Sequence, residues 1–130
     1  MKGTRRAPAL SFTAPVVKGS GRGRTIGFPT INLLPVAVPS SLRHGIYACR
    51  VVWNRKTYPA ALHYGPRPVF RAGIACEIHV IDAVLRRAPK RVTVEVVKRL
   101  RTIRNFKTVA LLKQQIARDV KRTREVLKNA

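Results

Sequence analysis

Acidic residues are scarce in this sequence, with five aspartates and glutamates against 27 lysines and arginines. The formal net charge is +22, and the isoelectric point is near 11.8. A charge of this size attracts polyanions, and nucleic acid is the obvious candidate partner. The basic residues are spread over the whole chain, which also fits a general compositional bias toward basic residues. The shortage of carboxylates leaves few candidates for acid–base chemistry.

Long apolar runs are also missing, because lysines and arginines interrupt every one of them. This absence excludes a membrane-spanning helix. The basic N-terminus lacks the apolar core of a secretory signal, so we expect a cytoplasmic protein with no membrane partner. Cysteine is rare as well. Cys49 and Cys76 each lie in a strand-like apolar run, where a reduced, buried thiol is expected.

Length and composition indicate a single domain. The chain has 130 residues, and 45% of them are hydrophobic, which is enough for a core and too apolar for a disordered chain. We interpret residues 1–8 as a basic flexible leader and residues 9–130 as the folded domain. We expect this domain to be a monomer.

Most of the domain has the pattern of short strands. They are expected at residues 10–17, 45–53, 57–64, 75–82 and 92–97, with a hairpin turn at 54–56 and a loop at 65–68. From Val109 to Leu127, apolar residues recur at spacings of three and four. This period predicts an amphipathic helix with Thr108 as its N-cap and a solvated basic face. Short strands followed by one helix predict a mainly β protein, an antiparallel barrel with the helix packed outside.

The segment at 19–33, GSGRGRTIGFPTINL, combines closely spaced glycines with two arginines. Bare backbone N–H groups at glycines can form an anion-binding concavity, and arginine adds fork-shaped donors for phosphate. Thr30 and Asn32 are two residues apart, so in an extended segment both side chains lie on one face. Their hard oxygen ligands suit a magnesium–phosphate site. Glycine content alone is equally typical of a flexible basic loop, and the segment is neither a Walker A motif nor a dinucleotide fingerprint.

Glu77 is the strongest candidate for a catalytic carboxylate. Alternation along the strand at 75–82 puts Glu77 and His79 on one face. Asp82, near the strand end, is the one rival. Of the other carboxylates, Glu95 is expected to point outward from its strand, and Asp119 and Glu125 are expected to lie on the helix, away from the loops. The histidines are interpreted as structural or incidental: His44, His63 and His79.

Taken in order, these motifs resemble the riboflavin kinase (flavokinase) domain, which in bacteria is usually the C-terminal half of a bifunctional riboflavin kinase/FAD synthetase. The resemblance covers residues 16–127. It rests on the G-x-G-R-G-R-x-x-G-F-P-T-x-N run, the E-x-H strand at 77–79, the Asn-Phe pair at 105–106 and the helix motif at 115–119. It implies a six-stranded antiparallel Greek-key barrel with one C-terminal α-helix packed outside. It also implies ATP-dependent phosphorylation of the riboflavin 5′-hydroxyl, giving FMN and ADP.

The resemblance assigns roles to individual residues. Thr30 and Asn32 match the residues that bind Mg²⁺ and the nucleotide phosphates, and Glu77 matches the catalytic base. The loop at 19–27 matches the lid over the nucleotide, with these binding residues: Gly19, Gly21, Arg22, Gly23, Arg24 and Thr25. The segment that closes over the flavin contributes Arg101, Arg104 and Phe106.

The segment at 83–89, AVLRRAP, departs from the family pattern, which usually has acidic residues and an aromatic turn there. We therefore expect the phosphate end of the site to be intact and the nucleoside end to be altered. No nucleotidyltransferase half is present, so the expected enzyme is a stand-alone riboflavin kinase that does not make FAD. The alternative is a catalytically impaired flavokinase-fold protein that binds nucleic acid non-specifically, or binds flavin.

Overall fold

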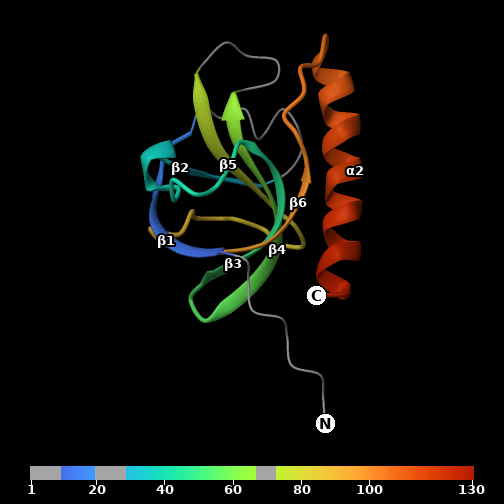
Figure 1. The fold of residues 1–130 in the computed structure, drawn as a ribbon. Helices are drawn as coiled ribbons and strands as arrows, with labels where there is room; N and C mark the ends of the chain where they lie inside the picture. Colours follow the sequence, from blue (N-terminus) through green and yellow to red (C-terminus); the bar gives the residue numbers. More distant parts are fainter. Residues whose placement is uncertain (1–9, 20–28, 67–72) are drawn as a thin grey trace.

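The computed structural model describes residues 10–19, 29–66 and 73–130. In it, strands close into a barrel in the order β1-β2-β5-β4-β3-β6, and a C-terminal helix lies outside (Figure 1). The elements are β1 (Leu10–Val17), β2 (Thr30–Leu33), the short 3₁₀ helix η1 (Pro35–Ala37), β3 (Gly45–Trp53), β4 (Lys56–Pro66), β5 (Ile74–Val80), β6 (Arg91–Arg101) and α2 (Val109–Lys128). The expected mainly β, six-stranded antiparallel barrel is confirmed. The leader at 1–8 lies outside the described residues.

The barrel interior is filled by alternate residues of each strand. On β6, Val92, Val94 and Val96 are buried while the residues between them face outward. On β5, Cys76, Ile78 and Val80 enter the same core cluster. Because side chains alternate across a strand, Glu77 and His79 must point out of the barrel. The alternation expected for this strand is thus confirmed, and it places polar groups on the outer surface.

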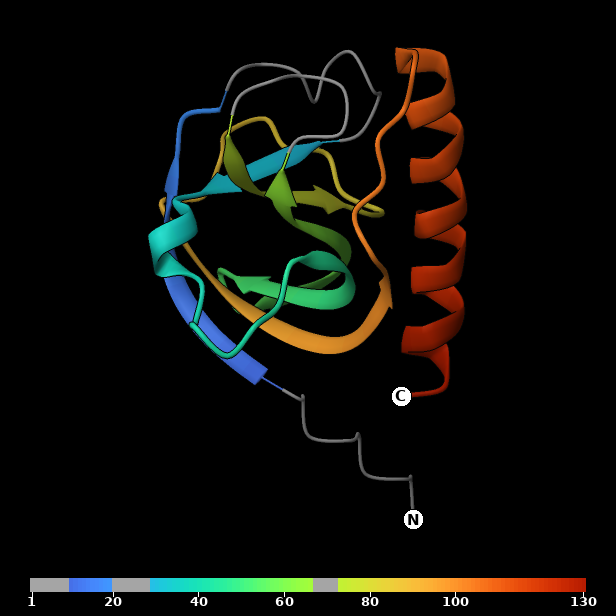
Figure 2. The same ribbon diagram turned by 45° about the horizontal axis from the view of Figure 1, so that its top comes forward.

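Helix α2 lies along the outside of the barrel, beside β3, β4 and β6 (Figure 2). Its buried face brings Leu112, Ile116 and Val120 against Ile81, just after β5. The helix begins as expected at its N-cap, where the Thr108 hydroxyl accepts a hydrogen bond of 3.1 Å from the backbone N–H of Leu111. Such a cap contributes about 1 kcal/mol to stability.

Several strand boundaries differ from those expected, and β4 begins at Lys56, inside the expected hairpin turn. The loop expected at 65–68 is wrong for Gly65 and Pro66, which continue β4 and pair with Ala75 and Ile74. Gly65 has φ 142°, a conformation that glycine tolerates. Pro66, at the end of the strand, lacks only its own backbone N–H as a hydrogen-bond donor. The strand expected at 92–97 extends to Arg101, because β6 keeps pairing with β3 through two register shifts. The strand expected at 75–82 ends at Val80.

The helix face expected to be solvated is partly engaged with the barrel. Arg122 donates a 2.7 Å hydrogen bond to the carbonyl of Leu100, and Arg124 forms an ion pair with Asp82. Their long side chains reach across the helix to neighbouring elements, which a helical wheel drawn from the sequence does not show.

The two cysteines have free, buried thiols as expected. Burial is the main reason that the pKa of Cys49 is raised and that of Cys76 reaches about 12, so both stay protonated at neutral pH. Over the described part of the chain, no helix has the length and apolar character needed to cross a membrane.

Candidate functional site

Strand β2 presents two oxygen-bearing side chains on the outside of the barrel. Ile31 and Leu33 are buried in the barrel core, so Thr30 and Asn32 point to the opposite, outer face. Both are half-buried. The extended segment inferred from the two-residue spacing is thus present, and it brings a hydroxyl and an amide onto one surface.

The neighbouring strand β5 places Glu77 beside these groups. In the antiparallel β2–β5 ladder, Asn32 is paired with Glu77 and Thr30 with His79. Residues directly opposite each other in such a ladder have Cβ atoms about 5 Å apart. The Oγ1 of Thr30 lies 3.4 Å from the Nδ1 of His79, which shows that the side chains of this face converge. The structure therefore gathers Thr30, Asn32 and Glu77 at one place.

His63 completes the row from the other side. It lies on β4 directly opposite Glu77, so Asn32, Glu77 and His63 are consecutive neighbours across three strands. Its Nε2 lies 3.1 Å from the carbonyl oxygen of Gly65, the geometry of a donated hydrogen bond. The sequence analysis dismissed this histidine as incidental. Its place beside Glu77 depends on the β4–β5 register, and the sequence carries no signal that fixes that register.

Both histidines of this face are neutral at physiological pH. Burial is the largest cause that lowers the pKa of His79, to about 4, with a smaller contribution from His63. Burial also lowers the pKa of His63, opposed by its hydrogen bond to Gly65 and by the charge of Glu77. This face thus carries two uncharged imidazoles beside the side chain of Glu77.

Gly19 packs directly against the amide of Asn32. A Cβ built at this glycine would lie 2.6 Å from the amide carbon of Asn32, far inside the distance that real carbon atoms reach. The glycine therefore makes room for the asparagine side chain between β1 and β2. The other expected loop residues, Gly21, Arg22, Gly23, Arg24 and Thr25, lie outside the described residues.

The donor set of this face fits a magnesium–phosphate group. Among the described residues, no cluster of three or more His, Cys, Asp or Glu side chains could hold a metal by itself. Mg²⁺ commonly takes few protein ligands and completes its shell with water and substrate phosphates. Thr30 and Asn32 supply hard oxygen atoms, and Gly19 closes the space behind the Asn32 amide as a cradle would.

The other four carboxylates are held elsewhere. Glu95 faces outward from β6, which is not a neighbour of β2, β4 or β5 in the barrel. Asp82 receives two hydrogen bonds, of 2.6 and 2.8 Å, from Arg124, and this arginine lowers the pKa of its carboxyl. Glu125 is exposed on α2, and Asp119 is buried on the same helix. Glu77 is therefore the one carboxylate that the strands of the Thr30/Asn32 face carry, and Asp119 acts on His79 from helix α2.

The end of β6 is fastened to α2 by a buried ion pair. Arg101 donates from Nε and Nη2 to the two carboxylate oxygens of Asp119, at 2.9 and 2.7 Å. Gln115 donates a further bond of 3.1 Å to the same carboxylate. Asp119 is expected from the sequence to lie on the helix, away from the loops. No local sequence pattern predicts that it pairs with Arg101. The pair fixes where the segment after β6 leaves the barrel.

That segment carries the other residues matched to flavin binding. The guanidinium of Arg104 lies over the ring of Phe106, 5.7 Å from its centroid. Phe106 also packs against the cluster formed by α2 and Ile81. The two side chains thus form a cation–aromatic unit at the entrance to α2, anchored on one side by the helix.

The chain is thus a small closed β-barrel with one outer helix, and adjacent strands of its outer face carry a carboxylate, a hydroxyl and an amide. The family model described as "Flavokinase: Riboflavin kinase" matches residues 7–127. The chain belongs to the riboflavin kinase family, as the resemblance of its motifs indicated.

Similar proteins include larger ones. The bifunctional riboflavin kinase/FMN adenylyltransferase of Escherichia coli (strain K12) is 37% identical over 119 residues, which cover 89% of this chain and 37% of that protein. The RNA-binding riboflavin kinase RibR of Bacillus subtilis (strain 168) is 27% identical over 107 residues, covering 81% of this chain and 46% of that protein. A crystal structure described as a macrolide-efflux protein from Streptococcus pneumoniae has a TM-score of 0.75 and 30% identity, over 91% of this chain and 39% of that chain. The chain thus spans less than half of each of these proteins.

Proposed function

We propose that this protein is a riboflavin kinase, which transfers the γ-phosphate of ATP to the riboflavin 5′-hydroxyl and releases FMN and ADP. The observation that carries the proposal is the β2–β5 register, which sets Asn32 opposite Glu77 and Thr30 one pair further along. Membership of the riboflavin kinase family supports the choice of substrates. Because the segment at 83–89 departs from the family pattern, the preferred nucleotide has to be determined by comparing activities with different nucleotides.

Glu77 acts as the general base in this proposal. The 5′-hydroxyl oxygen of riboflavin forms a bond to the γ-phosphorus while the bond from that phosphorus to the β–γ bridging oxygen breaks. The hydroxyl proton passes to the carboxylate of Glu77, and ADP leaves with the bridging oxygen. Phosphoryl transfer depends mainly on positioning and charge neutralisation, so one well-placed carboxylate is sufficient protein chemistry.

Thr30 and Asn32 would hold the magnesium ion and the phosphates beside this base. The ion, when bound, neutralises charge that develops on the phosphate oxygens. Gly19 has no side chain, and this leaves the Asn32 amide the space that it occupies. His63 and His79 line the same face, and burial lowers the pKa of both, so they are uncharged in the neutral range.

The flavin would lie against the segment between β6 and α2. Phe106 offers a ring face for stacking, and Arg104 lies above that ring. Arg101 is proposed to act mainly by holding this segment, because its guanidinium is already bound to Asp119. We further propose that the protein acts as a monomer in the cytoplasm, which suits its two reduced thiols.

The direct test is to incubate the protein with riboflavin, Mg²⁺ and ATP and to separate riboflavin from FMN by chromatography. We expect FMN to accumulate, and to be absent when Mg²⁺ is removed with a chelator. Parallel reactions with GTP and CTP measure the effect of the altered 83–89 segment. Absence of FMN with every nucleotide would refute the proposed activity.

Nucleic-acid binding is a second candidate function. The net charge of +22 favours it, and so does the similarity to a relative described as an RNA-binding riboflavin kinase. Binding through charge neutralisation has a simple signature, because affinity falls steeply as salt rises. An affinity that does not change between low and moderate salt would exclude this function.

A further inference from the structure

Helix α2 carries mainly basic residues at its exposed positions. Its exposed positions include basic residues at six places and an acidic residue at one: Lys113, Arg118, Lys121, Arg122, Arg124 and Lys128 against Glu125. A surface helix that is merely solvated usually mixes both signs and forms pairs three or four residues apart. These exposed cations form a positive surface that is complementary in charge to a polyanion.

Four of these cations lie along one side of the helix. Lys113, Lys121, Arg124 and Lys128 lie within an arc of about 80° on the helix, because their spacings of eight, three and four residues return to the same side. Among the residues that the structure describes, the three lysines make no ion pair, and Arg124 is paired with Asp82. We name this set of four the α2 ridge.

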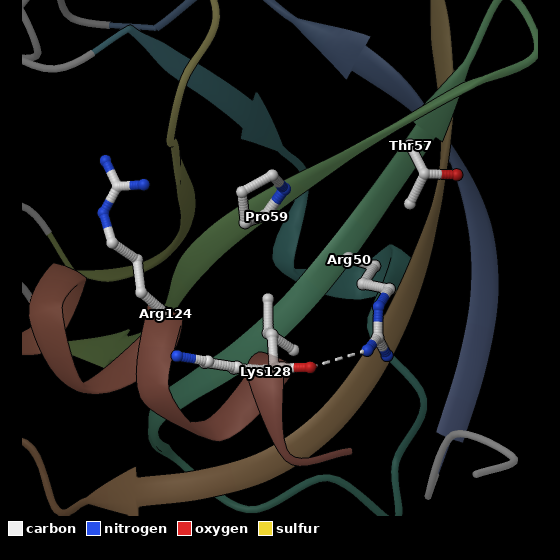
Figure 3. A pocket seen from close by; sticks show the side chains of 6 residues that line it. Arg50, Thr57, Pro59, Arg124 and Lys128 are labelled. Carbon is white, nitrogen blue, oxygen red and sulfur yellow. Dashed lines mark hydrogen bonds between the residues drawn. The ribbon is translucent and has the colours of Figure 1, made fainter. Parts of the chain in front are cut away.

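The C-terminal end of the ridge opens into a groove against the barrel. The groove has a volume of about 370 Å³ and is lined by six residues: Arg50, Thr57, Pro59, Arg124, Leu127 and Lys128. Figure 3 shows Arg50 and Thr57 on one side of the groove and Arg124 on the other, with Pro59 between them. Arg50 also donates a 3.3 Å hydrogen bond to the carbonyl of Leu127, which ties the end of α2 to β3. Three of the six residues that line the groove are basic, and two of them, Arg124 and Lys128, also belong to the α2 ridge.

We propose that the α2 ridge and this groove form a docking surface for the phosphodiester backbone of a nucleic-acid duplex. The ridge is about 22 Å long, since it spans fifteen residues at about 1.5 Å each. One strand of a duplex presents a phosphate about every 3.4 Å along its axis, so several phosphates face the ridge at once. A single phosphate group would contact only one or two of these cations. This inference deepens the second candidate function, on which it rests, by naming its surface and partner geometry.

Two observations favour a duplex backbone over other polyanions. An amphipathic helix binds an anionic membrane with its apolar face, but the apolar face of α2 is buried against the barrel. Recognition of single strands relies on exposed aromatic rings. Trp53 and Tyr58 instead stack on each other, 4.2 Å apart, and pack against the barrel core. The surface therefore reads charge and spacing and not bases.

The test compares two variants that lose the same charge. The ridge variant is Lys113→Gln/Lys121→Gln/Lys128→Gln. It keeps the Arg124–Asp82 ion pair and the hydrogen bond from Arg50 to the carbonyl of Leu127. The control variant, Arg86→Gln/Arg87→Gln/Lys90→Gln, removes three exposed charges from the β5–β6 connection. Binding to duplexes of about 20 base pairs, as RNA and as DNA, is followed by fluorescence anisotropy over a range of salt concentrations.

We expect wild-type protein to bind both duplexes. The slope of log affinity against log salt concentration should become shallower by about two to three units in the ridge variant, because each lost phosphate contact removes about 0.9 unit. The affinity of this variant at low salt should fall at least about tenfold. The control variant should keep its slope within about one unit. Equal losses in both variants would overturn the surface while leaving non-specific binding in place. No duplex binding by wild-type protein would overturn the second function itself, and binding to vesicles of anionic phospholipid alone would assign the ridge to membranes instead. Chemical denaturation of both variants serves as the folding control, and FMN formation by the ridge variant is an independent measure of the kinase.

Discussion

At the scale of single residues, the position of Asn32 depends on a glycine one strand away. Gly19→Ala places a methyl group about 2.6 Å from the amide carbon of Asn32, so the amide must move. We expect a loss of stability of about 1–3 kcal/mol, typical of overpacking, and a fall in turnover with a weaker apparent affinity for Mg²⁺. Chemical denaturation and initial rates at several Mg²⁺ concentrations measure the two effects.

A second substitution separates crowding from chemistry. In Gly19→Ala/Asn32→Ala the amide is gone, so the added methyl group at position 19 has space. The double variant should recover the lost stability but not the turnover. Recovery of turnover would mean that Asn32 has no part in the reaction.

His79 gives the same face a characteristic response to pH. Its pKa is about 4 in the folded protein because it is buried, against 6.5 when exposed. Between these values the unfolded chain binds a proton that the folded protein does not bind, so stability is fully present above pH 6.5 and is lost as the pH falls toward 4. The groups that face this imidazole are His63, Asp119 and Thr30.

We expect the free energy of unfolding to fall by about 3 kcal/mol over this interval on account of His79, at about 1.4 kcal/mol for each pKa unit. His63, whose pKa is also lowered, adds a loss of the same sign. Urea denaturation at a series of pH values measures the dependence. In His79→Gln the dependence should become shallower, and an unchanged slope would show that His79 titrates normally.

At the scale of secondary-structure elements, the ion pair of Arg101 and Asp119 joins β6 to α2. Its side chains are only 16% and 6% exposed, so Asp119→Asn leaves a buried guanidinium without its counter-charge. Breaking such a pair from one side typically costs about 3–5 kcal/mol. We expect a loss of this order in chemical denaturation. We also expect a raised KM for riboflavin with little change in the KM for ATP, because the loosened segment is the one matched to flavin binding.

The Arg124–Asp82 pair provides the matched control. It joins the same helix to the end of β5 with similar bond lengths, but its side chains are 50% and 58% exposed. Water and salt screen such a pair, so Asp82→Asn should change stability little and leave both KM values alone. If Asp119→Asn and Asp82→Asn had the same effects on stability and on the KM for riboflavin, the buried pair would not be what holds the segment after β6 in place.

How far the elements could be predicted depended on how local their signals are. The bounds of β1 and β3 and the start of α2 at Thr108 follow from alternation, helical period and a capping hydroxyl, which are properties of neighbouring residues. Thr30, Asn32 and Glu77 could be proposed as site residues because a family motif marks them. The proximity of His63 to Glu77 and of Arg101 to Asp119 follows from strand register and helix docking, which depend on residues far apart in the chain.

At the scale of the whole molecule, the net charge of +22 opposes the compact state. Mutual repulsion of like charges is reduced by salt, since the screening length falls from about 10 Å at 0.1 M to about 3 Å at 1 M. We therefore expect the thermal midpoint to rise as NaCl increases from about 0.05 to about 0.5 M, measured by circular dichroism. The ridge variant, with three fewer charges, should show a smaller rise. A midpoint that falls with salt would mean that attractive pairs outweigh repulsion.

The central claim is that the outer face of β2, β5 and β4 carries out phosphoryl transfer with Glu77 as its base. The most direct measurement is FMN formation by Glu77→Gln beside Glu95→Gln, an identical change on β6, which does not neighbour these strands. We expect Glu77→Gln to lose FMN formation by at least about a hundredfold, the lower range for a general base, while unfolding like wild type and while Glu95→Gln stays active. Normal FMN formation by Glu77→Gln would contradict the claim.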